Sequence, residues 1–387
     1  MVYVNTPTRQ NRQEANASMY WDWSPIKGLT AAIDYGLNYY NQFSYNANMP
    51  AQAYNFQTNS FGSRVYVGPN APIVNNTNTG YKTLLNARLN YHTIFKKNHD
   101  ISALFVYSEE YWYDRFQGSS RNDRLFPTLH EIDAALTDIQ GTGGNSSTEG
   151  LKSYIGRVNY TAFNKYLFEG NFRVDASSKF VPGQQYGFFP SVAVGWRFTE
   201  ENFLRPFLEK FLTNGKLRVS YGSLGNNSGI GRYEQRATLA ANNYIIANSV
   251  TRGFVNTKLI NKVLSWEATN ILDIGLELGF LRGRLSAEID YYDRVTTGLV
   301  RPSDLSILLS GAFAAPRTNI GQIRNRGVEG NFSWRDKIGK VNYGVSANVS
   351  YNRNLLEGWN EFIARGATSG GANIFLNMPC SNIYMEW

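Results

Sequence analysis

Apolar and polar residues alternate with a period of two along much of this chain, and this pattern limits the folds that it can adopt. In the segment LTAAIDYGLNYY, residues 29–40, Leu29, Ile33 and Leu37 fall on one face, and Asp34 and Asn38 fall on the other. RLSAEIDYYDR, residues 284–294, and VNYGVSANVSYN, residues 341–352, alternate in the same way. Side chains of a β-strand point alternately to its two faces, so the pattern predicts strands with one apolar and one polar face. About a dozen such segments occur, each of roughly 9 to 11 residues, the length that crosses a bilayer when tilted.

The connections between these segments alternate between short and long. Short turns are predicted at residues 25–28, 96–100, 164–165, 281–283 and 337–340, with a longer one at 200–214 that could contain a turn of helix. Long polar connections are predicted at residues 46–80, 117–150, 177–187, 223–265 and 298–321. An outer-membrane barrel has short turns at its periplasmic end and long loops outside the cell, whereas a compact soluble domain rarely has such long loops. The pattern therefore favours a transmembrane barrel over a soluble β-sandwich or propeller.

Composition excludes several other classes of protein. Hydrophobic residues make up 42% of the 387 residues, which excludes outright disorder, and charged residues make up only 18%. The net charge of +8 comes from scattered Lys and Arg rather than from a basic run, so no nucleic-acid partner is expected. No apolar stretch is long enough for a membrane-spanning helix, the first residues do not resemble a secretory leader, and Cys380 alone cannot form an internal disulfide.

Three long strings of residues occur in order between residues 164 and 334. NKYLFEGNFRVDASSKFVPGQQYGFFPSVAVGWRFTEENF, residues 164–203, contains R-x-D-x-S-S-[RK]-F and Y-G-[YF]-F-P-S. KLRVSYGSLGNN, residues 216–227, ends in Y-G-x-x-G-N. The third string runs from SWEATNILDIGLELGF through RLSAEIDYYDRVTTGLV to NIGQIRNRGVEGNFSW, residues 265–334. Together the strings resemble the SusC/RagA family of TonB-dependent outer-membrane transporters of Bacteroidota.

The resemblance implies an all-β protein, an antiparallel transmembrane β-barrel of about 22 strands with a plugged lumen. About 12 strands can be placed, so residues 1–387 are expected to be a partial barrel domain of a transporter roughly 900 residues long, without its plug, leader sequence and last strands. The resemblance also implies an outer-membrane location, surrounding lipid, a SusD-like surface lipoprotein, energy from the TonB–ExbB–ExbD complex through the plug, and import of oligosaccharides or peptides. Two alternatives remain open: a passive porin-like or adhesive barrel, and a soluble β-rich binding module.

Charged residues on the polar strand faces are candidates for a network that lines the lumen. They are Asp34, Arg157, Arg173, Arg197, Arg218, Asp273, Glu277, Glu288 and Asp290. A structural role, bracing the barrel or its plug, is favoured over direct contact with substrate, and each solvated pair should contribute only about 0 to 1 kcal/mol.

Aromatic residues near the long connections are candidates for binding substrate. They are Trp112, Tyr113, Phe116, Tyr186, Tyr233, Tyr244 and Trp359. Aromatic faces stack on sugar rings or peptide side chains while polar tips form hydrogen bonds, although each ring could equally pack within a loop. No catalytic residue, metal site or cofactor is expected, because the three histidines lack metal-ligand spacing and no nucleophile elbow occurs.

Overall fold

The computed structural model describes residues 8–47, 51–67, 72–122, 131–135, 140–246, 248–303, 308, 313, 315–358, 367–369 and 372–374. Among these residues, twelve long strands form one sheet in which each strand neighbours the one that precedes it along the chain. The strands are β1 (Thr8–Ile26), β2 (Leu29–Ala47), β5 (Ile73–Phe95), β6 (His99–Arg121), β7 (Gln140–Ala162), β8 (Tyr166–Ser177), β9 (Tyr186–Trp196), β10 (Leu212–Asn226), β13 (Glu267–Phe280), β14 (Leu285–Thr297), β17 (Gln322–Ile338) and β18 (Val341–Gly358). The predicted β-sheet of about twelve strands is confirmed.

Smaller elements lie in the connections. Four two-stranded hairpins are formed by β3 (Ala51–Asn55) with β4 (Ser60–Val67), β11 (Leu239–Ile246) with β12 (Ser249–Asn256), β15 (Val300–Pro302) with β16 (Arg317–Asn319), and β19 (Ala367–Ser369) with β20 (Ala372–Ile374). The helical turns are η1 (Ile132–Ala134), η2 (Phe198–Glu200), α1 (Arg205–Leu208) and η3 (Leu281–Gly283). No helix among the described residues is long and apolar enough to cross a membrane.

The long strands exceed the predicted 9 to 11 residues. Their lengths run from 11 residues in β9 to 23 in β5, β6 and β7. The predicted connection at 117–150 was wrong in its extent, since it contains the end of β6 and the beginning of β7, and the connection at 46–80 contains β3, β4 and the beginning of β5. Backbone hydrogen bonds can continue a strand through polar residues that show no alternation.

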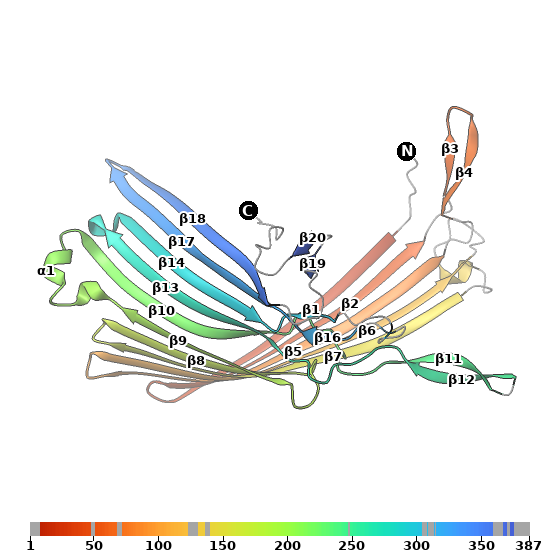
Figure 1. Ribbon diagram of the computed structural model, residues 1–387, viewed down its shortest axis with the longest axis horizontal. Helices are drawn as coiled ribbons and strands as arrows, with labels where there is room; N and C mark the ends of the chain where they lie inside the picture. Colours follow the sequence, from red (N-terminus) through yellow and green to blue (C-terminus); the bar gives the residue numbers. More distant parts are fainter. Residues whose placement is uncertain are drawn as a thin grey trace. The chain divides into compact units, whose positions relative to one another are not determined.

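By its contacts the chain divides into two compact units. The first comprises Met1–Trp21, Ile33–Asn86 and Glu109–Gly150, and the second comprises Asp22–Ala32, Ala87–Ser108 and Leu151–Trp387. In the second unit, Figure 1 shows β8, β9, β10, β13, β14, β17 and β18 side by side, with α1 at one end of the strands and the β11–β12 hairpin beyond the other. Each strand pair from β7 to β18 within this sheet is antiparallel.

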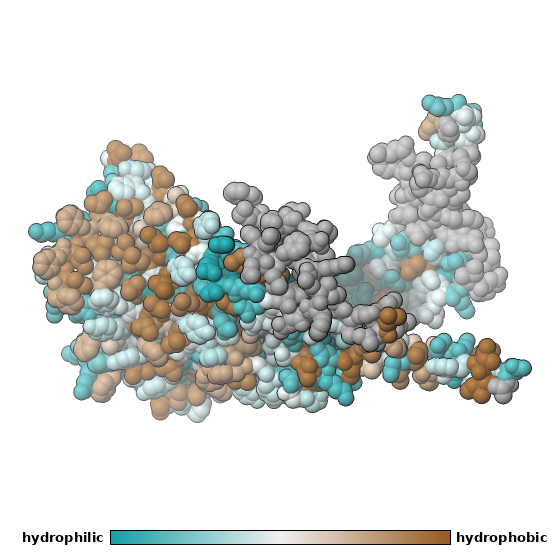
Figure 2. Space-filling view, viewed as in Figure 1, coloured by the Kyte–Doolittle hydropathy of each residue, from teal (hydrophilic) through white to brown (hydrophobic). Residues whose placement is uncertain are grey.

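The sheet of the second unit exposes its apolar face. Directly paired residues form a row across seven strands, and every side chain in it is exposed: Phe168, Val194, Val219, Ile274, Tyr291, Val328 and Tyr351. Figure 2 shows hydrophobic residues in brown across these strands. The opposite face carries Arg218, Asp273 and Asp290, and Asp290 is buried. This is the reverse of a soluble sheet, whose apolar face is covered by its core.

The turn between β9 and β10 folds back onto the apolar face and is held there by Glu201. The Glu201 carboxylate accepts hydrogen bonds from the Tyr166 hydroxyl at 2.5 Å and from the Trp196 indole at 3.2 Å, and Lys165 Nζ lies 3.2 Å from its other oxygen. Tyr166, Trp196 and Leu217 are paired neighbours on the apolar face of β8, β9 and β10. The buried Thr199 adds a second contact, since its hydroxyl oxygen accepts the backbone N–H of Gly215 at 3.1 Å.

This arrangement predicts an acid-sensitive turn. The hydrogen bond from Tyr166, then that from Trp196 and the contact with Lys165, hold the pKa of Glu201 below its usual 4.5 against the opposing effect of burial. The folded state therefore binds its proton less readily than the unfolded state. The carboxylate stabilises the turn fully above pH 4.5, and this contribution is lost as the pH falls through the lower folded-state pKa.

Hydrogen exchange of residues 197–211 checks this expectation as the pH is lowered from neutral to about 3. After correction for intrinsic exchange, protection should fall in the native protein and change little in Glu201→Gln. Glu209→Gln is a matched control, because Glu209 lies in the same turn with an exposed side chain, and it should behave as the native protein does. An equal acid loss in Glu201→Gln would contradict the assignment.

Candidate functional site

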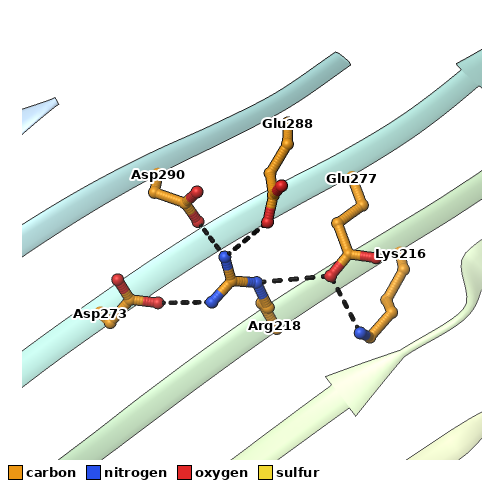
Figure 3. Close-up of polar contacts among 6 residues, drawn as sticks. All are labelled: Lys216, Arg218, Asp273, Glu277, Glu288 and Asp290. Carbon is orange, nitrogen blue, oxygen red and sulfur yellow. Dashed lines mark hydrogen bonds and ion pairs between the residues drawn. The ribbon is translucent and has the colours of Figure 1, made fainter. Parts of the chain in front are cut away.

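Arg218 on β10 is the centre of a charge network on the polar face of the sheet. Its guanidinium lies 2.9 Å from Asp273, 3.0 Å from Glu288, 2.5 Å from Asp290 and 3.4 Å from Glu277 (Figure 3). Lys216 also contacts Glu277, at 2.9 Å. The sequence predicted that Arg218 and these four acidic residues would lie on polar strand faces, and the structure brings them together. Their four carboxylates exceed the two cations in number, so the network has an excess of negative charge.

Gly275 allows Arg218 to reach across β13. Arg218 pairs with Gly275, and Gly275 pairs with Asp290 on the next strand. A Cβ atom at position 275 would lie 2.5 Å from Nε and 2.7 Å from Cζ of Arg218, too close for any side chain. The glycine therefore provides the space in which one guanidinium links three strands.

A second polar network lies on the same face of β7, β8 and β9. Arg173 Nε bonds both oxygens of Asp175, at 2.7 and 2.8 Å, and its Nη2 donates to Ser153 at 3.1 Å. Arg157 Nε donates to Asn171 at 2.8 Å, and Asn171 donates in turn to Glu169 at 2.7 Å. The predicted candidates Arg157 and Arg173 are thus braced by neighbouring strands.

These side chains border a hollow of about 940 Å³, within the size range of ligand sites. Its lining combines charged and amide side chains from the second network with Arg218, Ser191, Ser220 and, at one end, the rings of Phe189 and Trp266. Such a surface offers hydrogen-bond donors and acceptors beside aromatic rings, which suits a polar solute or an opposing polar protein surface.

At that end a set of apolar side chains joins separate connections, and we call it the loop clamp: Phe180, Phe189, Ile230, Leu264, Trp266 and Val300. Phe180 and Ile230 are almost fully buried. The Trp266 ring lies 5.1 Å from that of Phe180 and 5.6 Å from that of Phe189, and its indole N–H donates to the Gln185 carbonyl at 3.0 Å. Trp266 thereby fastens the β8–β9 connection to the start of β13.

Polar contacts tie further connections to the loop clamp. The Asn319 amide donates to the carbonyls of Ser265 and Gly298 at 2.8 and 2.9 Å, and its oxygen accepts the Ser265 N–H at 2.8 Å. Asn227 donates to the Ser177 hydroxyl at 3.0 Å. The loops at this end of β8, β10, β13, β14 and β17 are therefore built as one interlocked set.

Two predicted members of the charge network lie elsewhere. Arg197 follows the last residue of β9 and donates to the Asn164 carbonyl at 3.1 Å, in the turn between β7 and β8. Asp34 lies on β2 in the first unit, half-buried. In that unit, polar contacts on β2, β5 and β6 include Tyr40 with Asp114 at 2.5 Å and Lys82 with Glu110 at 2.8 Å.

The predicted aromatic candidates occupy different environments. On β6, the ring of Trp112 faces the Lys82 ammonium at 4.8 Å, whereas its neighbour Tyr113 stacks on Tyr81 at 5.3 Å. Phe116 is half-buried and covers Gly118. In the second unit, Tyr186 is exposed, Tyr233 lies beside Arg236, and the Tyr244 hydroxyl donates to the Phe254 carbonyl at 3.3 Å within the β11–β12 hairpin. Trp359 lies outside the described residues.

Sequence reasoning missed the loop clamp, Gly275 and the turn-fastening role of Glu201. The signal was present, because Phe180, Trp266, Gly275 and Asn319 all belong to the three recognised strings. The described residues hold no group of three His, Cys, Asp or Glu side chains arranged to bind a metal ion.

Comparison with known proteins gives consistent matches. The sequence profile described as "TonB dependent receptor-like, beta-barrel" matches residues 2–377. A TonB-dependent receptor of Formosa agariphila is 30% identical over 331 residues, which are 84% of this chain and 30% of that receptor. The TonB-dependent receptor SusC of Bacteroides thetaiotaomicron is 34% identical over 209 residues, 53% of this chain and 20% of SusC.

Among solved structures, the RagAB peptide importer in its closed-closed state matches with a TM-score of 0.83. The match covers 96% of this chain and 39% of the importer chain at 22% identity, so it shows the fold alone. The chain thus spans well under half the length of the proteins that it matches.

Proposed function

We propose a function from the premise that this chain belongs to the SusC/RagA family of TonB-dependent receptors. Its twelve strands are part of the transmembrane β-barrel of that family. We infer that the whole protein lies in the outer membrane and actively imports oligosaccharides or peptides. The energy would come from the TonB–ExbB–ExbD complex, acting through a plug domain outside this chain.

The reversed polarity of the sheet is the observation that carries this proposal. The exposed row from Phe168 to Tyr351 suits contact with lipid, whereas the charged face with Arg218 requires water or polar protein groups. A barrel wall meets both demands at once, with lipid outside and a polar lumen inside.

The partner and the substrate follow from the loop end of the strands. The loop clamp joins several connections into a shaped rim, onto which a SusD-like lipoprotein would deliver the solute. The likeness to SusC and to the fold of the RagAB peptide importer supports this assignment. We assign no covalent chemistry to the chain, because its family consists of receptors and transporters.

Uptake by living cells tests active import. Cells that carry the full-length gene should take up candidate oligosaccharides or peptides, and deletion of TonB should abolish that uptake without lowering the amount of barrel in the outer membrane. A strain that lacks only the SusD-like gene should lose uptake as well. Uptake that survives loss of TonB would identify a passive porin instead, and a full-length protein that folds as a monomer without detergent would identify a soluble binding module.

A further inference from the structure

The turn between β9 and β10 is longer than closure of the hairpin requires. Four residues join β13 to β14, and two join β17 to β18, at the same end of the sheet. By contrast, the β9–β10 connection contains η2, α1 and the residues around them. This extra segment calls for an explanation other than reversal of the chain.

Three phenylalanines in this segment point into solvent. Phe203, Phe207 and Phe211 are 65, 75 and 73% exposed. They are spaced four residues apart along consecutive helical turns, in which Arg205 N bonds Glu201 O and Leu208 N bonds Leu204 O. Residues four apart lie on one face of a helix, so the rings form a single apolar surface, which we call the phenylalanine face.

The segment lies on the apolar side of the sheet, not across its polar face. Glu201 is held by Tyr166 and Trp196, which are paired neighbours on the apolar face, and Phe198 packs on Trp196 with ring centroids 5.9 Å apart. The phenylalanine face is therefore continuous with the surface that the family places against lipid. Figure 2 shows hydrophobic residues gathered around the position that α1 occupies in Figure 1.

Basic side chains flank the rings. Arg205 and Lys210 are exposed within the same segment, and both have alkyl stems long enough to reach lipid phosphates from beside a buried ring. Aromatic rings with basic neighbours are the composition that binds the boundary between lipid headgroups and acyl chains.

We propose that the phenylalanine face inserts into the phospholipid leaflet at the short-turn end of the barrel and anchors that rim at the membrane interface. The apolar row of the strands covers the hydrocarbon thickness, and the phenylalanine face extends the contact to the headgroup level. The anchor is independent of which solute is imported, because no group of the polar face takes part in it.

Site-specific fluorescence on the full-length receptor tests this proposal. A variant carrying Phe207→Cys in a cysteine-free background is labelled with an environment-sensitive fluorophore and reconstituted in phosphatidylethanolamine–phosphatidylglycerol vesicles. Lys340→Cys in the β17–β18 turn is the matched control, because it lies at the same end of the sheet and is exposed. Each label is quenched separately by aqueous iodide and by lipids that carry a nitroxide near the headgroup.

The label at position 207 should emit at shorter wavelength than the label at position 340, be several-fold less accessible to iodide and be quenched by the nitroxide lipids. Equal iodide accessibility at the two positions would overturn the proposal. Shielding from iodide without quenching by lipid would also overturn it and would place protein against the rings. The triple variant with Phe203, Phe207 and Phe211 changed to serine should keep its barrel and lose nitroxide quenching of a label at Lys210→Cys.

Discussion

Replacing Arg218 with methionine should produce the largest loss of stability of any single substitution in the polar face. The change removes the cation that contacts Asp273, Glu277, Glu288 and Asp290 and leaves Lys216 alone among four carboxylates. The Arg218 side chain is 32% exposed, so water screens part of this repulsion. We therefore expect the free energy of unfolding to fall by about 3 kcal/mol, the lower end of the cost of breaking a buried ion pair.

Urea unfolding of the full-length receptor in vesicles measures this effect. Arg218→Lys keeps the charge but lacks the planar fork, so its loss should be intermediate. Arg301→Met is the control, because Arg301 is exposed on β15. The double variant Arg218→Met with Asp290→Asn should recover part of the loss, since one uncompensated charge is removed. If Arg218→Met were no more harmful than Arg301→Met, the network would have no structural role.

Replacing Trp266 with alanine should release the loops while leaving the strands intact. The substitution removes the ring contacts with Phe180 and Phe189 and the hydrogen bond to Gln185. Loss of a packed tryptophan costs about 3 kcal/mol or more, so hydrogen exchange in residues 178–185 and 227–238 should become roughly a hundredfold faster. Exchange in β14 and β17 should stay as it is in the native receptor.

Two further variants separate the causes. Trp266→Phe keeps a ring in the loop clamp and loses the indole N–H, so its effect should be smaller than that of Trp266→Ala. Phe254→Ala removes an equally large apolar group from the exposed β11–β12 hairpin and should leave both loops protected. Unchanged exchange in Trp266→Ala would show that the polar contacts of Asn319 and Asn227 alone hold the loops.

Alternation predicted strands best where the two faces of the sheet differ in polarity. The segment from Leu29 to Tyr40 was assigned from its pattern and lies within β2. The first residues of β7, QGTGGNSSTEG, carry no alternation and were assigned to a connection. Polar groups satisfy both faces of such a segment, while its backbone hydrogen bonds do not depend on side-chain pattern. Sequence therefore located the strands but underestimated their length.

The candidate site could be predicted as far as residue parity allows. Parity placed Arg218 and its acidic partners on polar faces, but the pairing register decided that Arg218 crosses Gly275 toward Asp290. Arg197 was wrongly extrapolated into the same set, because the strand ends at Trp196 and the chain then turns. The loop clamp depends on contacts among residues far apart in the chain, which periodicity alone does not reveal.

The alternation of short and long connections also implies an order of assembly. About four residues separate β13 from β14, whereas about 40 separate β10 from β13. Closing the longer loop costs about 2 kcal/mol more chain entropy than closing the shorter one. Hairpins joined at the short-turn end, such as β13–β14 and β17–β18, should therefore form first as units. The sheet would then grow by adding preformed pairs rather than single strands, and the loop clamp would close last.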